Sequence, residues 1–169
     1  MIIKVLVWTA AAAAAVVALI VAIGYALPQS HVAARTAVLP APEAEVFRTI
    51  TDVQAFPSWR SDVAAVQLLA TSPRLRWTEQ GPEGSITFEV AEFSPPAKLV
   101  SRIADADLPF GGTWTYDLRG AGGETTLTIT ERGEVYNPVY RFVSRFVLGH
   151  RATIDRYLSD LERALGRGG

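Results

Sequence analysis

The sequence predicts an α+β domain, in which an antiparallel sheet packs against one long C-terminal helix, preceded by a single apolar helix. Three observations predict this arrangement. Residues 5–27 carry no charged side chain, residues 63–134 alternate between apolar and polar side chains in short runs, and residues 138–165 place apolar side chains at helical spacing. At 169 residues and without cysteine, the chain has the length of one compact domain that needs no disulfide.

The charge and the residue types exclude several classes of protein. There are 16 Lys and Arg residues against 17 Asp and Glu, a net charge of −1, whereas proteins that coat nucleic acid need a strong basic excess. The chain has no cysteine and only two histidines, His31 and His150, far apart in the sequence, so no zinc motif is present. We therefore expect no metal, no cofactor and no nucleic-acid partner.

The positive mean hydropathy of +0.19 originates at the N-terminus. Of the first 27 residues, 24 are hydrophobic, and Lys4 carries the only charged side chain. A helix over residues 5–27 would be about 35 Å long, enough for a hydrocarbon core of about 30 Å. Trp8 and Tyr25 lie near its two ends, where aromatic side chains favour the membrane interface, and Pro28 ends it.

This segment has three interpretations: an uncleaved anchor, a secretory signal peptide, or a buried helix of a soluble domain. The apolar region of a signal peptide has about 7–15 residues, so the length favours the anchor, and its uniformly apolar surface disfavours the third interpretation. We assign residues 1–28 to a single-pass transmembrane anchor (or uncleaved signal) and residues 29–169 to the domain. Lys4 favours a cytoplasmic N-terminus and a domain on the extracytoplasmic side.

The domain begins with a strand over residues 31–39, which Pro40 and Pro42 end. Pro42 suits the first position of a helix, and a second short helical piece over residues 53–62 carries Phe56 and Trp59. Six further strands are predicted at residues 63–69, 75–80, 86–91, 98–105, 114–118 and 125–134. Their alternation indicates antiparallel strands with one buried face and one solvent face.

The last segment is predicted as a helix of up to 28 residues over 138–165, with one apolar face, in which Gly149 allows a bend. A curved sheet that closes around such a helix forms an α+β domain. The space between sheet and helix is then a common place for an apolar ligand.

The order of several short motifs resembles a known superfamily. These motifs are Pro40 to Phe47 (PAPEAEVF), Phe56 to Trp59 (FPSW), Phe110 to Tyr116 (FGGTWTY), Thr128 to Glu134 (TITERGE) and Asn137-Pro138. From about His31 to Leu165 the chain resembles the SRPBCC superfamily, also called START-like or Bet v 1-like, and within it the bacterial polyketide cyclase/dehydrase and lipid transport group.

The resemblance implies the helix-grip fold, a curved antiparallel sheet around the C-terminal helix with a tunnel between them. Members bind lipids, sterols, polyketides or other hydrophobic molecules, and some are enzymes. We expect membrane-tethered binding or transfer of a hydrophobic small molecule, such as a lipid, an isoprenoid or a polyketide-like compound. The alternatives are a cyclase/dehydratase-type enzyme acting on such a ligand and a non-catalytic structural domain.

Three residues are candidates for acid–base chemistry. Glu131 shares strand parity with Leu127 and Ile129, and a carboxyl group that faces an apolar cavity has a raised pKa. The simpler interpretation is that Glu131 lies at the rim or is paired with an arginine, for which Arg102 is the best candidate. Arg102 itself faces either the tunnel, where it could anchor a ligand carboxylate or enolate, or solvent. His150 lies on the apolar face of the last helix, as a cavity contact or an ordinary core or rim group.

The tunnel lining is expected to be mainly aromatic. The candidates are Trp77, Phe88, Phe110, Trp114, Tyr116 and Phe146. The alternative for these side chains is simple core packing. We interpret residues 106–112 as a mobile loop over the tunnel mouth, with Phe110 as its apolar tip.

Overall fold

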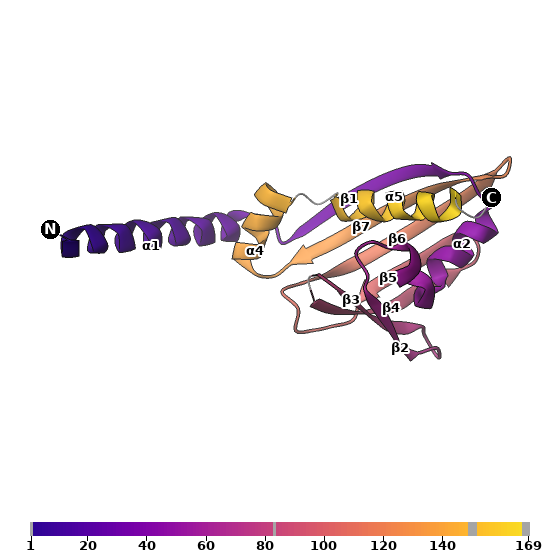
Figure 1. Ribbon diagram of the computed structural model, residues 1–169, viewed down its shortest axis with the longest axis horizontal. Helices are drawn as coiled ribbons and strands as arrows, with labels where there is room; N and C mark the ends of the chain where they lie inside the picture. Colours follow the sequence, from indigo (N-terminus) through magenta and orange to yellow (C-terminus); the bar gives the residue numbers. More distant parts are fainter. Residues whose placement is uncertain (1, 83, 149–151, 167–169) are drawn as a thin grey trace.

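The computed structural model describes residues 2–82, 84–148 and 152–166. Its centre is a seven-stranded antiparallel sheet with the strand order β1-β7-β6-β5-β4-β3-β2 (Figure 1). The strands are β1 (Ser30–Leu39), β2 (Ala65–Ala70), β3 (Arg76–Gly81), β4 (Gly84–Ser94), β5 (Lys98–Ile103), β6 (Phe110–Ala121) and β7 (Glu124–Val135). The helices are α1 (Ile2–Ala26), α2 (Glu43–Thr51), η1 (Val53–Ala55), α3 (Phe56–Trp59), α4 (Pro138–Val143), η2 (Ser144–Leu148) and α5 (Ala152–Gly166). The predicted α+β helix-grip arrangement is confirmed.

The strand predictions are confirmed in order, but β6 is longer than the predicted 114–118. It begins at Phe110, because Gly111 and Gly112 pair with Glu134 and Gly133 of β7. Phe110 is opposite Val135 in this register, so it lies in the sheet and not at the tip of a loop. Because glycine has no side chain, Gly111 and Gly112 give this part of the strand no apolar and polar alternation to reveal it.

One face of the sheet, which we call the inner face, carries the core. Helices α2, α3 and α5 cover it, and the odd-numbered residues of β1 and β7 face it. The largest fully buried apolar side chains are Leu39, Val46, Ile50, Leu127, Ile129, Ile154 and Leu161. They come from both the sheet and the helices, so residues 30–166 form one core.

The predicted C-terminal helix over 138–165 is divided between two locations. Helix α4 packs against α1, whereas α5 packs against β1 and α3 on the inner face (Figure 1). Between them, η2 is a π-helical stretch, and Gly149, the predicted bend, lies outside the described residues. Helical periodicity reports which side of a helix is apolar and not which partner that side meets.

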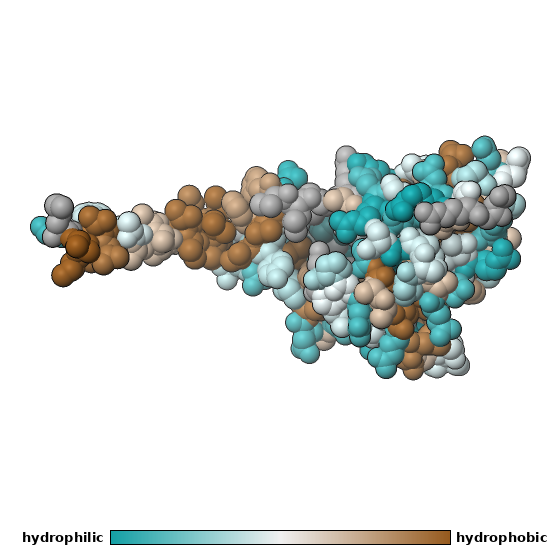
Figure 2. Space-filling model, in the orientation of Figure 1, coloured by the Kyte–Doolittle hydropathy of each residue, from teal (hydrophilic) through white to brown (hydrophobic). Residues whose placement is uncertain are grey.

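Helix α1 has 25 residues and is long and apolar enough to cross a membrane. Figure 1 shows it projecting from the domain, and Figure 2 shows its apolar surface extending from a mostly hydrophilic body. Of its described residues only Gly24 is buried. The helix therefore contributes almost nothing to the core of the domain.

Candidate functional site

Four of the predicted lining side chains lie on the inner face of the sheet. Trp77 and Tyr116 are buried, and the half-buried Phe88 and Trp114 pack against the core. Trp77 stacks on Phe88 with ring centroids 5.6 Å apart. On the α5 side, the ring of Tyr157 lies 5.7 Å from both Trp114 and Tyr116, so an aromatic side chain fills the space between β6 and α5.

The other two predicted lining residues lie elsewhere. Phe146 belongs to η2, is 61% exposed and packs on Phe142 with ring centroids 5.0 Å apart. Phe110 is half-buried at the start of β6. Neither is part of the aromatic group formed by Trp77, Phe88, Trp114, Tyr116 and Tyr157.

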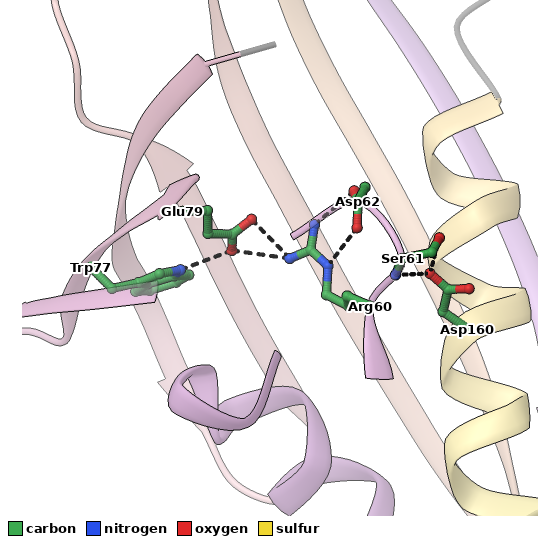
Figure 3. Close-up of polar contacts among 6 residues, drawn as sticks. All are labelled: Arg60, Ser61, Asp62, Trp77, Glu79 and Asp160. Atoms are coloured by element: carbon green, nitrogen blue, oxygen red, sulfur yellow. Dashed lines mark hydrogen bonds and ion pairs between the residues drawn. The ribbon is translucent and has the colours of Figure 1, made fainter. Parts of the chain in front are cut away.

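A buried ion-pair cluster lies beside Trp77 (Figure 3). Arg60 follows α3 and donates hydrogen bonds to Glu79 of β3, with Nη1···Oε1 at 3.0 Å. It also donates to both carboxylate oxygens of Asp62, at 3.1 and 3.0 Å. Trp77 donates its indole N–H to Glu79 at 2.9 Å. The cluster thus joins the end of α3 to the inner face of β3.

Burial and charge act against each other in this cluster. Burial raises the pKa of Glu79, and the Arg60 guanidinium lowers it in part, with a net rise. Burial lowers the pKa of Arg60, but the charge of Glu79 and the hydrogen bond to Asp62 outweigh it, so the net shift is upward. The guanidinium also lies 5.1 Å from the ring centroid of Phe56 and 5.2 Å from that of Tyr157, within cation–π range.

A second polar contact fixes α5 to the end of α3. Asp160, 1% exposed, accepts hydrogen bonds from the backbone N–H of Ser61 at 2.7 Å and from its hydroxyl at 2.8 Å (Figure 3). Arg163 also donates to Asp160. These bonds place Tyr157, one turn before Asp160, directly over the Arg60 cluster.

Two buried polar atoms near this cluster have no hydrogen-bond partner among the described residues. They are the indole N–H of Trp59 and the hydroxyl of Tyr157. Their rings are in edge-on contact, with centroids 5.4 Å apart. Burial raises the pKa of Tyr157 well above its ordinary value, and the neighbouring Tyr116 hydroxyl raises it further, so the phenol remains neutral and can donate. An unsatisfied buried donor costs about 1–3 kcal/mol.

The molecular surface is hollowed on two sides of this region. The larger hollow, about 590 Å³, has apolar walls from Leu75, Val90 and Phe93. The smaller, about 230 Å³, is lined by Trp59, Arg60 and Asp160 among others. Only the larger volume falls within the range of about 300–1,000 Å³ that is typical of small-molecule sites.

The three acid–base candidates are not brought together. Glu131 faces inward, as its parity predicts, and its Oε1 lies 3.3 Å from Nε2 of His31. Burial raises its pKa, and the contact with His31 offsets this in part. Arg102 is on the opposite, solvent-exposed face and pairs with Glu89. His150 lies outside the described residues. Thus the inward partner of Glu131 is His31 and not Arg102.

The buried cluster contains residues that the sequence pattern did not indicate. Glu79 shares strand parity with the buried Trp77. An acidic residue on the apolar face of a strand is unusual, and this could have identified Glu79 as a candidate site residue. Arg60 and Tyr157 gave no comparable signal, because their roles depend on contacts with distant elements. Among residues 2–82, 84–148 and 152–166, no group of three His, Cys, Asp or Glu side chains could hold a metal ion.

The structure is a helix-grip domain with an aromatic inner face and a few buried polar groups, and this gives the general class of the protein. Comparison with known proteins gives its family. The profile described as "Polyketide cyclase / dehydrase and lipid transport" matches residues 30–166. The chain therefore belongs to this family. No curated protein matches it by sequence.

Solved structures share the fold at low sequence identity. A START superfamily protein from Mycobacterium smegmatis is 18% identical, with a TM-score of 0.64 over 82% of this chain and 99% of that one. A protein from Thermus thermophilus is 16% identical, with a TM-score of 0.70 and the same coverage. The Zhui aromatase/cyclase from Streptomyces is 12% identical, with a TM-score of 0.65 over 82% and 94%. At these identities the similarity establishes the fold alone.

Proposed function

We propose that this protein is a membrane-tethered binding or transfer protein for a hydrophobic small molecule that carries one polar group. The family includes lipid transport in its description, and α1 is long and apolar enough to serve as the tether. A tethered domain exchanges an apolar ligand with the bilayer over a short distance. In line with the charge near the N-terminus, we place the domain on the extracytoplasmic side.

The observation that carries this proposal is the pair of unpartnered donors inside an aromatic core. Buried polar groups are nearly always hydrogen-bonded. We therefore expect the Trp59 N–H and the Tyr157 hydroxyl to donate to an acceptor on a bound molecule. A carbonyl, carboxylate or hydroxyl oxygen is a suitable acceptor for such a donor. The adjacent Arg60 favours an acceptor that is negatively charged or strongly polarised.

The larger hollow supplies room for the apolar part of the ligand. Leu75, just before β3, accepts a hydrogen bond from the backbone N–H of Val90 on β4, and both residues line the hollow. The next inner-face pair along these strands is Trp77 and Phe88, about 7 Å further on. We place the apolar part of the ligand in this hollow and its polar group at the donors beside Arg60. The molecule would then lie along Trp77 and Phe88.

Native mass spectrometry of the full chain, after extraction with mild detergent and incubation with a total lipid extract, tests this proposal. We expect bound lipid on the wild type and on Leu69→Trp, a control at an exposed β2 position. We expect none on Leu75→Trp, whose indole fills the hollow. A wild-type chain that binds no lipid, or equal binding by both variants, would contradict the proposal.

A cyclase/dehydratase-type reaction is the second candidate, and the inward pair of Glu131 and His31 favours it. A carboxyl group with a raised pKa beside an imidazole can transfer a proton to or from a ligand. Turnover of a polyketide-like substrate that disappears in Glu131→Gln, while binding persists, would establish this reaction. Binding without turnover by the wild type would leave the binding function alone.

A further inference from the structure

Helices α1 and α4 are joined at the membrane-proximal end of the domain by one arginine. Arg141 donates to the backbone carbonyls of Gly24 at 3.2 Å and Leu27 at 3.4 Å. It also donates to the carbonyls of Val135 at 2.8 Å and Tyr136 at 2.9 Å. A single guanidinium therefore holds the end of α1, the end of β7 and the start of α4 in one arrangement.

The close approach of the two helices depends on a glycine. Gly24 lies against Pro138, and a Cβ atom at position 24 would collide with the Pro138 carbonyl. Backbone contact at this point fixes the position of α4 along the axis of α1. Figure 1 shows α4 directly beside the end of α1, on the side of the domain that faces the helix.

Apolar and aromatic side chains around α4 are left uncovered. We call the group formed by Tyr136, Val139, Tyr140 and Phe146 the junction patch; its members are 40% to 61% exposed. The surrounding stretch, residues 135–154, contains three arginines and no acidic residue. Of these arginines, Arg145 is exposed beside Phe146. The nearest carboxylate in the sequence is Glu134, which accepts a hydrogen bond from Tyr136 at 3.0 Å.

The position of the junction patch along α1 corresponds to a membrane interface. If residues 5–27 cross the hydrocarbon core, Gly24 lies about 4.5 Å before the end of the span. The start of α4, in contact with Gly24, is then at the boundary between the acyl chains and the headgroups. Tyr side chains are enriched at that level, and arginines there extend toward phosphate groups.

We propose that the junction patch is a membrane-docking surface, with α4 and η2 lying in the interface of the bilayer that α1 crosses. This inference rests on the proposed membrane tether. The bilayer is the occupant that the structure favours, because the patch adjoins the exposed apolar surface of α1 and carries the exposed Arg145 beside Phe146, with Glu134 as its one acidic neighbour among residues 134–148. The domain is thereby seated on the membrane and does not hang from a flexible linker.

Site-specific fluorescence of the full chain in vesicles tests the docking. The sequence has no cysteine, so single variants carry one NBD label each: Tyr140→Cys and Phe146→Cys in the patch, Trp8→Cys in α1, and Glu124→Cys as the control. Glu124 starts β7, 11 residues from Val135, which places it about 36 Å from the membrane-proximal end. The vesicles contain phosphatidylcholine and phosphatidylglycerol, with and without nitroxide-labelled lipid.

We expect nitroxide lipid to quench the labels at positions 8, 140 and 146 but not at 124. We also expect iodide in the buffer to quench only the label at 124. Quenching by lipid at position 8 alone would overturn the docking and leave the tether intact. No lipid quenching at any position would overturn both. Labels at 140 and 146 that are shielded from iodide but not reached by nitroxide lipid would show a protein partner or a second copy on the patch, which also overturns the inference.

Discussion

The hydroxyl of Tyr157 is the residue-scale feature that most directly links stability to binding. It is buried without a hydrogen-bond partner among the described residues, so Tyr157→Phe removes an unsatisfied donor and keeps the ring contacts. We expect the ligand-free variant to be more stable by about 1–3 kcal/mol and to capture less lipid. Thermal unfolding and native mass spectrometry measure the two effects.

Tyr140→Phe is the matched control, because its hydroxyl is on an exposed ring. We expect that change to leave both stability and lipid capture unaltered in detergent solution. A destabilised Tyr157→Phe would show that the hydroxyl already has a partner. It would therefore contradict the role we give to this group.

Glu131 predicts a pH dependence of stability. Burial raises its pKa in the folded chain, so between the unfolded and the folded pKa the native state binds more protons than the unfolded state. Stability then falls as pH rises through this window, and the contribution of Glu131 is fully favourable only below the unfolded pKa. Glu131→Gln removes the titration.

Urea unfolding at a series of pH values from about 4, the unfolded pKa of Glu, up to neutral measures the difference between the two proteins. We expect the variant to gain stability relative to the wild type as pH increases. Glu79, whose pKa is also raised, titrates in both proteins and cancels in the difference. A difference that is independent of pH would show that Glu131 is not perturbed by folding.

At the scale of elements, the contact between α1 and α4 depends on Gly24. In Gly24→Val the new side chain would collide with the Pro138 carbonyl, so the helices separate and Arg141 loses its bonds to the carbonyls of Gly24 and Leu27. We expect faster hydrogen exchange in α4, measured by mass spectrometry of the full chain in nanodiscs. The unfolding temperature of the domain should not change, because α1 lies outside the core.

Ala14→Val is the control for this change. It adds the same kind of branched side chain to an exposed position in the middle of α1, far from the junction. Equal exchange in the wild type and in both variants would mean that the Gly24 contact does not restrain α4.

Sequence periodicity predicted the strands well and the last helix only in part. In β1, β3 and β7, buried and more exposed side chains alternate, so a period of two identifies these strands without knowledge of their neighbours. In the last segment, Val139 and Phe146 continue the same apolar spacing as Ile154 and Leu161. The first pair is exposed on α4 and η2 and the second is in the core, a difference in surroundings that no spacing encodes.

The candidate site was less predictable than the fold. Trp77 and Tyr116 were found because inward aromatic residues follow from strand parity. Arg60 lies in the connection after α3, and its role depends on Glu79, which is 19 residues away. Tyr157 reaches the cluster from the other end of the domain. Such contacts arise from how the elements pack, which the pattern within each element does not specify.

At the scale of the whole molecule, the chain is divided into a domain over residues 30–166 and the apolar helix α1. The family match covers residues 30–166, and the core contains no residue of α1. The contacts between the two parts are concentrated at Gly24, Leu27 and Arg141. We therefore expect the domain to fold independently of α1, and the proposed tether to depend on α1.

Deletion of residues 1–28 tests this division. The deletion removes two of the four carbonyl partners of Arg141 but no core side chain, so we expect cooperative unfolding at a temperature within a few degrees of the full chain. We also expect unchanged lipid capture in detergent, but slower exchange of a fluorescent fatty acid with vesicles, because the ligand must then cross water. Near-ultraviolet circular dichroism and a vesicle transfer assay measure these effects. Loss of cooperative unfolding would show that α1 belongs to the folding unit, and equally fast exchange would show that tethering does not assist transfer.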